Sequence, residues 1–185
     1  MTLAELIAFI GSRLDQSGIP YMIVGSIASS YHGEPRATRY LDVVIDPSVE
    51  ALRRFVAALA TKDFYVDGDS ALEALRDRGQ FNVIEQATGW KVDLVIRKDR
   101  PFSIEEFGRR LAAELVGVPS FVATAEDMII AKLEWAKRGE SERQLRDVSA
   151  MLATGRGMLD LSYLKHWVSA LGLRDEWQAA VTASG

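Results

Sequence analysis

The spacing of apolar residues at the start of the chain predicts a helix, a strand and a second helix in succession. A capping box from Thr2 to Glu5 precedes a run of apolar residues at helical spacing. The apolar run Tyr21–Val24 predicts a buried strand, and residues 27 to about 31 predict a short helix. A Gly25-Ser26 step separates this strand from this helix.

Alternation of apolar and polar residues predicts strands in the middle of the chain. From residue 40 to residue 46, the odd positions are apolar, and the even positions lie on the opposite face. Residues 81–86 and 90–96 alternate on either side of Ala87-Thr88-Gly89, which predicts a β-hairpin. Asp46-Pro47 predicts the start of a helix, with the aspartate as its N-cap.

Weaker signals complete the predicted fold. Residues 62–66 predict a strand, residues 71–78 a helix, and the capping box from Ser103 to Glu106 another short helix. Residues 114–116 and 120–122 predict small strands, and from Thr124 onward only helical patterns occur. We therefore expect an α+β fold. Residues 1–123 would form a core with a mixed β-sheet flanked by helices, and residues 124–185 a helical region packed on that core.

Composition narrows the classes of function. The 185 residues are 48% hydrophobic and 26% charged, which is typical of a globular protein with a real core. The net charge of 22 − 26 = −4 disfavours general coating of nucleic acid. The lack of cysteine excludes thiolate chemistry and is typical of a reducing compartment. No apolar run approaches the roughly 20 residues of a membrane span, so we expect a cytoplasmic protein without a membrane partner.

The Gly25-Ser26 step is a candidate phosphate-binding turn. Glycine lets backbone approach a ligand closely, and the N-terminus of the following helix would present unpaired N–H groups and the positive end of its dipole. The serine hydroxyl adds a hydrogen-bond donor. The alternative is a plain turn from strand to helix without a ligand.

Two aspartates within predicted strands are candidate ligands of a cation. Asp42 lies among Val and Ile residues, and Asp93 lies on the strand face opposite Trp90 and Val92. Carboxylates are disfavoured in strands and costly to bury alone. Because Mg²⁺ prefers oxygen ligands, two such groups beside a phosphate-binding turn predict a magnesium site. The alternative for each aspartate is a place on a solvated sheet face.

Taken together, these residues resemble the nucleotidyltransferase (polymerase-beta-like) superfamily. The resemblance spans roughly residues 20 to 152. Closer similarity to the AbiEii-type branch, which supplies the toxins of many bacterial toxin–antitoxin pairs, comes from two helical segments and from an Arg-x-Thr sequence before Asp42. The segments that carry the resemblance are Gly25-Ser26, residues 35–42, Lys91-Val92-Asp93, residues 126–133 and residues 146–152.

The resemblance implies a reaction and roles for particular residues. The family binds a nucleoside triphosphate such as ATP with Mg²⁺ and transfers the nucleoside monophosphate to a hydroxyl group of an RNA, a protein or a small molecule. It implies that Asp42 and Asp93 are metal ligands and catalytic, and that Lys132 is catalytic and offsets triphosphate charge. An antitoxin protein is an implied partner. The implied nucleotide-binding residues are Gly25, Ser26, Arg36, Thr38, Lys132 and Asp147.

Two of these assignments have alternatives. Lys132 lies close to an apolar stripe, where it could extend its ammonium group to solvent or form a structural ion pair with Asp147. Arg36 could receive phosphate groups of a nucleotide or RNA, or be a solvated loop charge.

The chain departs from the family pattern at its first metal-binding carboxylate, which is replaced by Tyr40. Tyr40 and Asp42 share a strand face, so the phenol points toward the site, and a neutral phenol is a poor ligand for Mg²⁺. We expect transfer to be weak, altered or absent. Three hypotheses follow: an impaired nucleotidyltransferase, a non-catalytic module that binds a nucleotide or a protein, and an interaction protein that docks through its C-terminal helices.

Overall fold

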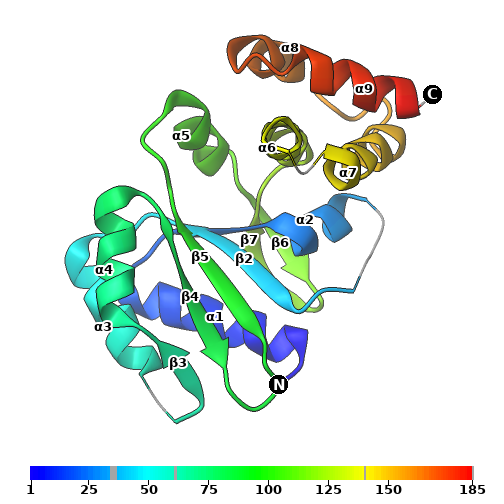
Figure 1. Ribbon diagram of the computed structural model, residues 1–185. Coiled ribbons are helices and arrows are strands. Elements are labelled where there is room, and N and C mark those ends of the chain that lie inside the picture. Colours follow the sequence, from blue (N-terminus) through cyan, green and yellow to red (C-terminus); the bar gives the residue numbers. More distant parts are fainter. Residues whose placement is uncertain (34–36, 61, 140, 185) are drawn as a thin grey trace. The chain divides into compact units, whose positions relative to one another are not determined.

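A mixed β-sheet organises residues 1–123 (Figure 1). The computed structural model describes residues 1–33, 37–60, 62–139 and 141–184. Within them the sheet has seven strands in the order β3-β4-β5-β2-β1-β7-β6. The parallel pairs are β1 with β7 and β2 with β5, and the other neighbours are antiparallel. The strands are β1 (Tyr21–Val24), β2 (Tyr40–Ile45), β3 (Phe64–Val66), β4 (Gln80–Glu85), β5 (Lys91–Ile96), β6 (Leu111–Leu115) and β7 (Val118–Val122).

Helices occupy most of the remaining described chain. Their first members alternate with the strands, and the last four follow one another without a strand between them. They are α1 (Leu3–Ser17), α2 (Gly25–His32), α3 (Val49–Leu59), α4 (Gly68–Asp77), α5 (Pro101–Gly108), α6 (Ala125–Lys137), α7 (Ser141–Thr154), α8 (Leu161–Ala170) and α9 (Arg174–Ser184). The mixed sheet and the C-terminal helices confirm the predicted α+β class.

One face of the sheet is the main hydrophobic core. Helices α1, α3 and α4 lie together on this side of the sheet (Figure 1). The odd-numbered residues of β2 and the even-numbered residues of β5 point into this core, since residues two apart in a strand share a face. The opposite face of the two strands carries their polar residues together with Val44 and Val95. This core side includes Leu41, Val43, Ile45, Val92, Leu94 and Ile96.

The chain divides into two compact units. The first comprises Met1–Ile27 and Ala37–Ala123, and the second comprises Thr124–Gly185 with the described residues of Ala28–Arg36. The first unit ends at Ala123, and α2 passes from one unit into the other. The predicted division into domains at residue 123 stays a prediction. The packing of residues 124–185 on the core stays a prediction.

In the second unit, α7 packs on α6 and α9. Apolar residues of these helices form its interior, with Ile129, Leu133 and Val148 fully buried. Among the described residues, no helix combines the length and apolar character that a membrane crossing requires.

Several local predictions are confirmed. The Thr2 capping box begins α1, and Gly18 ends this helix in the left-handed conformation. The hairpin around residues 87–89 joins β4 to β5, and Thr124 caps α6.

Several helix starts differ from prediction; α4, for example, begins at Gly68 and not at residue 71. Ser48, and not Asp46, is the N-cap of α3, because the Asp46 carboxylate pairs with Arg97 at 3.0 Å. The helix α5 begins at Pro101, where proline is favoured, so Ser103 lies inside the helix and its hydroxyl accepts from Arg100. Gly25 and Ser26 are the first residues of α2 and not a separate turn before it.

Candidate functional site

The junction between β1 and α2 brings the backbone of Gly25 against the side chain of Asp42. The strands β1 and β2 pair antiparallel, and the register places Val24 opposite Asp42. Gly25 has a φ of 64°, in the left-handed region that favours glycine. A Cβ added at Gly25 would lie 2.0 Å from Asp42 Oδ2. A side chain at position 25 is therefore incompatible with the observed place of the Asp42 carboxylate.

The parallel pairing of β2 with β5 places Asp42 directly beside Asp93. Neighbouring strands lie about 4.8 Å apart, so the side chains of two residues in register project from the same face and lie close together. The expected meeting of Gly25, Asp42 and Asp93 is therefore observed. Ser26 follows Gly25 as the second residue of α2 and is half-buried.

Two further side chains extend this face by one step along the strands. Tyr40 lies opposite Lys91 in the same parallel register, two residues before the aspartates. The Lys91 Nζ atom lies 3.0 Å from Asp93 Oδ1 and 5.6 Å from the centre of the Tyr40 ring. The lysine thus lies between a carboxylate and an aromatic face, both of which attract a cation. We call Tyr40, Asp42, Lys91 and Asp93 the strand quartet.

Asp93 forms an ion pair, but its carboxylate is not fully hydrogen-bonded. Its side chain is 17% exposed, and its Oδ1 atom is buried. Among the described residues, no donor reaches this oxygen with hydrogen-bond geometry. The Lys91 ammonium supplies charge but no aligned hydrogen bond. A buried oxygen in this state is stabilised by an additional donor or cation.

This arrangement fits one hard cation. Asp42 and Asp93 offer carboxylate oxygens side by side, and the buried Oδ1 atom of Asp93 lacks an aligned donor. It offers too few carboxylates for a pair of ions, because the next side chain on this face of β2, Tyr40, is a phenol. Within the described ranges, no group of three or more His, Cys, Asp or Glu side chains is arranged to hold a metal.

The other predicted site residues lie elsewhere or are engaged locally. Thr38 exchanges hydrogen bonds with the backbone of Tyr40, accepting from its N–H at 3.1 Å, so it fixes the start of β2. Arg36 falls outside the described residues. Lys132 and Asp147 belong to the second unit, on α6 and α7.

Lys132 and Asp147 form the structural ion pair that was one alternative for this lysine. Lys132 Nζ donates to Asp147 Oδ2 at 2.6 Å and to Gln144 Oε1 at 3.3 Å. The lysine is 5% exposed. Its charge is therefore already balanced within the second unit, and a role toward a nucleotide stays a prediction.

Lys91 is the residue of the quartet to which sequence reasoning assigned no role. The signal was present, because residues 91 and 93 share a strand face by their spacing of two. What the spacing alone could not provide is the neighbour across the strands, Tyr40, which depends on the parallel register.

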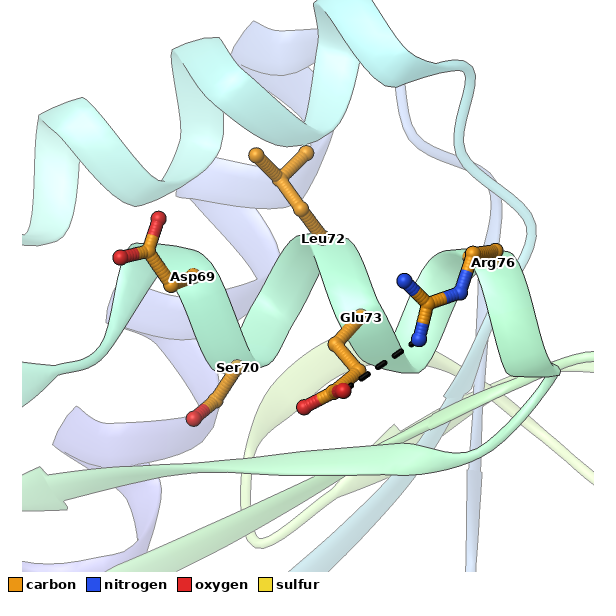
Figure 2. Close-up of a pocket in the computed structure, with 5 residues that line it drawn as sticks. All are labelled: Asp69, Ser70, Leu72, Glu73 and Arg76. Carbon is orange, nitrogen blue, oxygen red and sulfur yellow. Dashed lines mark hydrogen bonds and ion pairs between the residues drawn. The ribbon is translucent and has the colours of Figure 1, made fainter.

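A shallow pocket of about 360 Å³ on α4 is unrelated to this site. Figure 2 shows that its lining comes from one helix and that Glu73 faces Arg76, with which it forms an ion pair. The helix packs on the core side of the sheet, opposite the quartet. Because Arg76 also pairs with Asp77, its charge is not available to a ligand in this arrangement. The lining residues are Asp69, Ser70, Leu72, Glu73 and Arg76.

Comparison with known proteins rests on structure alone. No protein family model matches the chain, and no curated protein sequence matches it. Solved structures with a similar fold do exist.

Three of these structures match along nearly the whole chain. The crystal structure of ANT(2'')-Ia in complex with adenylyl-2''-tobramycin has a TM-score of 0.64 at 17% identity, covering 96% of this chain and 99% of that one. An antigenic nucleotidyltransferase-like protein from Paracoccidioides brasiliensis has a TM-score of 0.57 at 18% identity, covering 96% and 91%. The solution structure of ANT(2'')-Ia, at 15% identity, also scores 0.57 and covers 95% and 93%. The fold of this chain is therefore nucleotidyltransferase-like.

Proposed function

We propose that this chain binds a nucleoside triphosphate at the β1–α2 junction and the strand quartet. We further propose that it transfers the nucleoside monophosphate slowly to a hydroxyl acceptor, with cleavage of the bond between the α- and β-phosphates and release of pyrophosphate. The observation that carries the proposal is the close approach of Gly25 to Asp42, with Asp93 in register beside it. The nucleotidyltransferase-like fold supports it.

The triphosphate would lie at the start of α2. The positive end of a helix dipole lies at its N-terminus and favours an anion there. Gly25 brings this backbone close to the aspartates, and Ser26 offers a hydroxyl group. Thr38, at the start of β2, is a further proposed nucleotide contact, whereas the nucleotide-binding roles of Arg36, Lys132 and Asp147 stay predictions.

One Mg²⁺ ion would be held by Asp42 and Asp93. When bound, it would neutralise phosphate charge and polarise the phosphorus for attack. The chain's own residues do the rest: Gly25 and Ser26 position the phosphates, and the Asp93 carboxylate can accept the proton of the attacking hydroxyl. Tyr40 removes a carboxylate from this site, which is why we propose a low rate.

Several classes of hydroxyl acceptor are compatible with the proposal. ANT(2'')-Ia, which shares the fold, forms a complex with adenylyl-2''-tobramycin. An adenylyl group joined to a small molecule supports ATP as the nucleotide and a small hydroxyl compound as one acceptor class for this chain. From the AbiEii-type resemblance we propose, as the alternative, an RNA or protein acceptor. The same resemblance would give the chain a toxin role and an antitoxin partner.

A second candidate function is a nucleotide-binding module without transfer. Two features favour it: Tyr40 in place of a carboxylate, and Lys91 paired with Asp93. Calorimetry with ATP, GTP, CTP and UTP, alongside a transfer assay, separates the two. Binding without product supports the module.

The decisive experiment restores the missing carboxylate. We expect Tyr40→Asp to raise Mg²⁺-dependent transfer of labelled nucleotide at least tenfold, which corresponds to about 1.4 kcal/mol of barrier. Tyr65→Asp is the matched control, because Tyr65 on β3 is 56% exposed against 52% for Tyr40. An unchanged or lower rate in Tyr40→Asp, at full nucleotide binding, would remove the transferase proposal and leave the binding module.

A further inference from the structure

The strand quartet contains the Lys91 ammonium group, which occupies part of the proposed metal site. Lys91 Nζ lies 3.0 Å from Asp93 Oδ1, the carboxylate that a divalent ion would also require. Two cations cannot share this oxygen at contact distance without strong repulsion. A metal ion that binds Asp93 must therefore displace the Lys91 ammonium.

Lys91 has the freedom and the chemistry to be displaced. Its side chain is 35% exposed, and its contact with Asp93 lacks hydrogen-bond alignment. Its second neighbour is the Tyr40 ring at 5.6 Å, a weak attraction at an exposed position. Once released, an ammonium on a flexible four-carbon chain acts as a mobile point charge that suits phosphate.

We infer that Lys91 is an exchangeable internal cation: it occupies Asp93 in the free protein and moves to the triphosphate when a divalent ion takes its place. This inference rests on the proposed function and adds a positioning and binding residue to it. Each step leaves every charge partnered, because the metal replaces the lysine at Asp93 and the phosphates receive the lysine. Metal and nucleotide binding are thereby coupled through one side chain.

The test uses two ligands on which Lys91→Met has opposite effects. In the full chain without nucleotide, Mn²⁺ binding measured by electron paramagnetic resonance should tighten about tenfold, because the competing charge is gone. Calorimetric titration with Mg-ATP should show binding weakened about tenfold, because the phosphates lose a partner. Lys98→Met, at an exposed lysine beyond the end of β5, should change either affinity less than twofold.

The pattern of outcomes separates the alternatives. If Lys91 had only a structural role, Lys91→Met would weaken the binding of both ligands. If Lys91 only competed with the metal, the variant would bind Mn²⁺ more tightly and Mg-ATP with unchanged affinity. Either result overturns the inference. If the wild type binds Mg-ATP and Lys91→Met alters neither affinity, the inference fails and the proposed function stands. If the wild type binds Mn²⁺ but none of the four nucleoside triphosphates, the proposed function and the inference fail together.

Tyr40→Leu gives a graded check. It removes the aromatic face that holds Lys91 but no formal charge. We expect Mn²⁺ binding to change about twofold or less. A tightening as large as that of Lys91→Met would assign the competition to the ring and not to the lysine, against the inference.

Discussion

Each unit of the molecule holds a lysine–aspartate pair, and the two pairs differ in how completely they are satisfied. In the second unit, Lys132 is 5% exposed and donates both to Asp147 and to Gln144. In the first unit, the Lys91 side chain is 35% exposed, and the buried oxygen that it faces has no aligned donor among the described residues. The Lys132–Asp147 pair is arranged as a structural element, whereas the Lys91–Asp93 pair is arranged for exchange of its cation.

The largest expected effect is on stability and falls on the second unit. Lys132→Met should lower the free energy of unfolding by about 3 kcal/mol, because it removes the buried ammonium group that donates to Asp147 at 2.6 Å. Lys91→Met should cost less than about 1 kcal/mol, as is usual for a partly exposed pair. Denaturant unfolding of both variants measures the difference.

Lys137→Met is the control for this comparison. Lys137 lies on the same helix as Lys132, is exposed, and donates to the carbonyl of Gly172 at 2.7 Å. Its loss should cost less than about 1 kcal/mol. Equal losses in Lys132→Met and Lys91→Met would contradict the distinction drawn between the two pairs.

The next effect concerns the close approach that defines the site. Gly25→Ala should destabilise the protein by about 2 kcal/mol, because a side chain is strained in the left-handed region and its Cβ would overlap Asp42. In the double variant with Asp42→Ala, part of that cost should disappear, since the overlapping carboxylate is absent. Unfolding curves of the two single variants and the double variant form the cycle. Strict additivity would show that the two residues do not compete for space.

Sequence patterns predicted the elements of this site better than their partners. Alternation along residues 40–46 and 90–96 placed both aspartates on polar strand faces, and this is observed because only the other face meets α1, α3 and α4. A shared site of Asp42 and Asp93 was expected, but their direct register was not, since no local pattern reveals which strands pair in parallel.

The wrong N-cap has a related cause. Asp46 has the right local sequence to cap a helix, but Arg97 arrives from the end of β5 and binds its carboxylate. A long-range ion pair thus overrides a local preference. No role was predicted for Lys91 for a similar reason: its proposed role depends on its contact with Tyr40, which lies on another strand.

The smallest expected effect sharpens the contrast between satisfied and unsatisfied carboxylates. Glu85 is buried at the end of β4. The Thr88 hydroxyl donates to it, as do the backbone N–H groups of Thr88 and Ala87. These bonds, the Thr88 hydroxyl foremost, hold the pKa of Glu85 below its ordinary value of 4.5. Because the folded state lowers this pKa, its stabilisation is fully present above pH 4.5 and is lost as the pH falls through the lowered value.

Melting temperatures from pH 7 to pH 3 test this. Glu85→Gln should melt lower at pH 7 and show a flatter decline toward pH 3, because it lacks the carboxylate whose protonation the wild type must accept. Glu114→Gln, at an exposed position on β6, should follow the wild-type profile. A Glu85→Gln profile parallel to that of the wild type would mean that the hairpin does not depend on the charge of this carboxylate. The three hydrogen bonds that distinguish Glu85 from Asp93 would then have no measurable consequence.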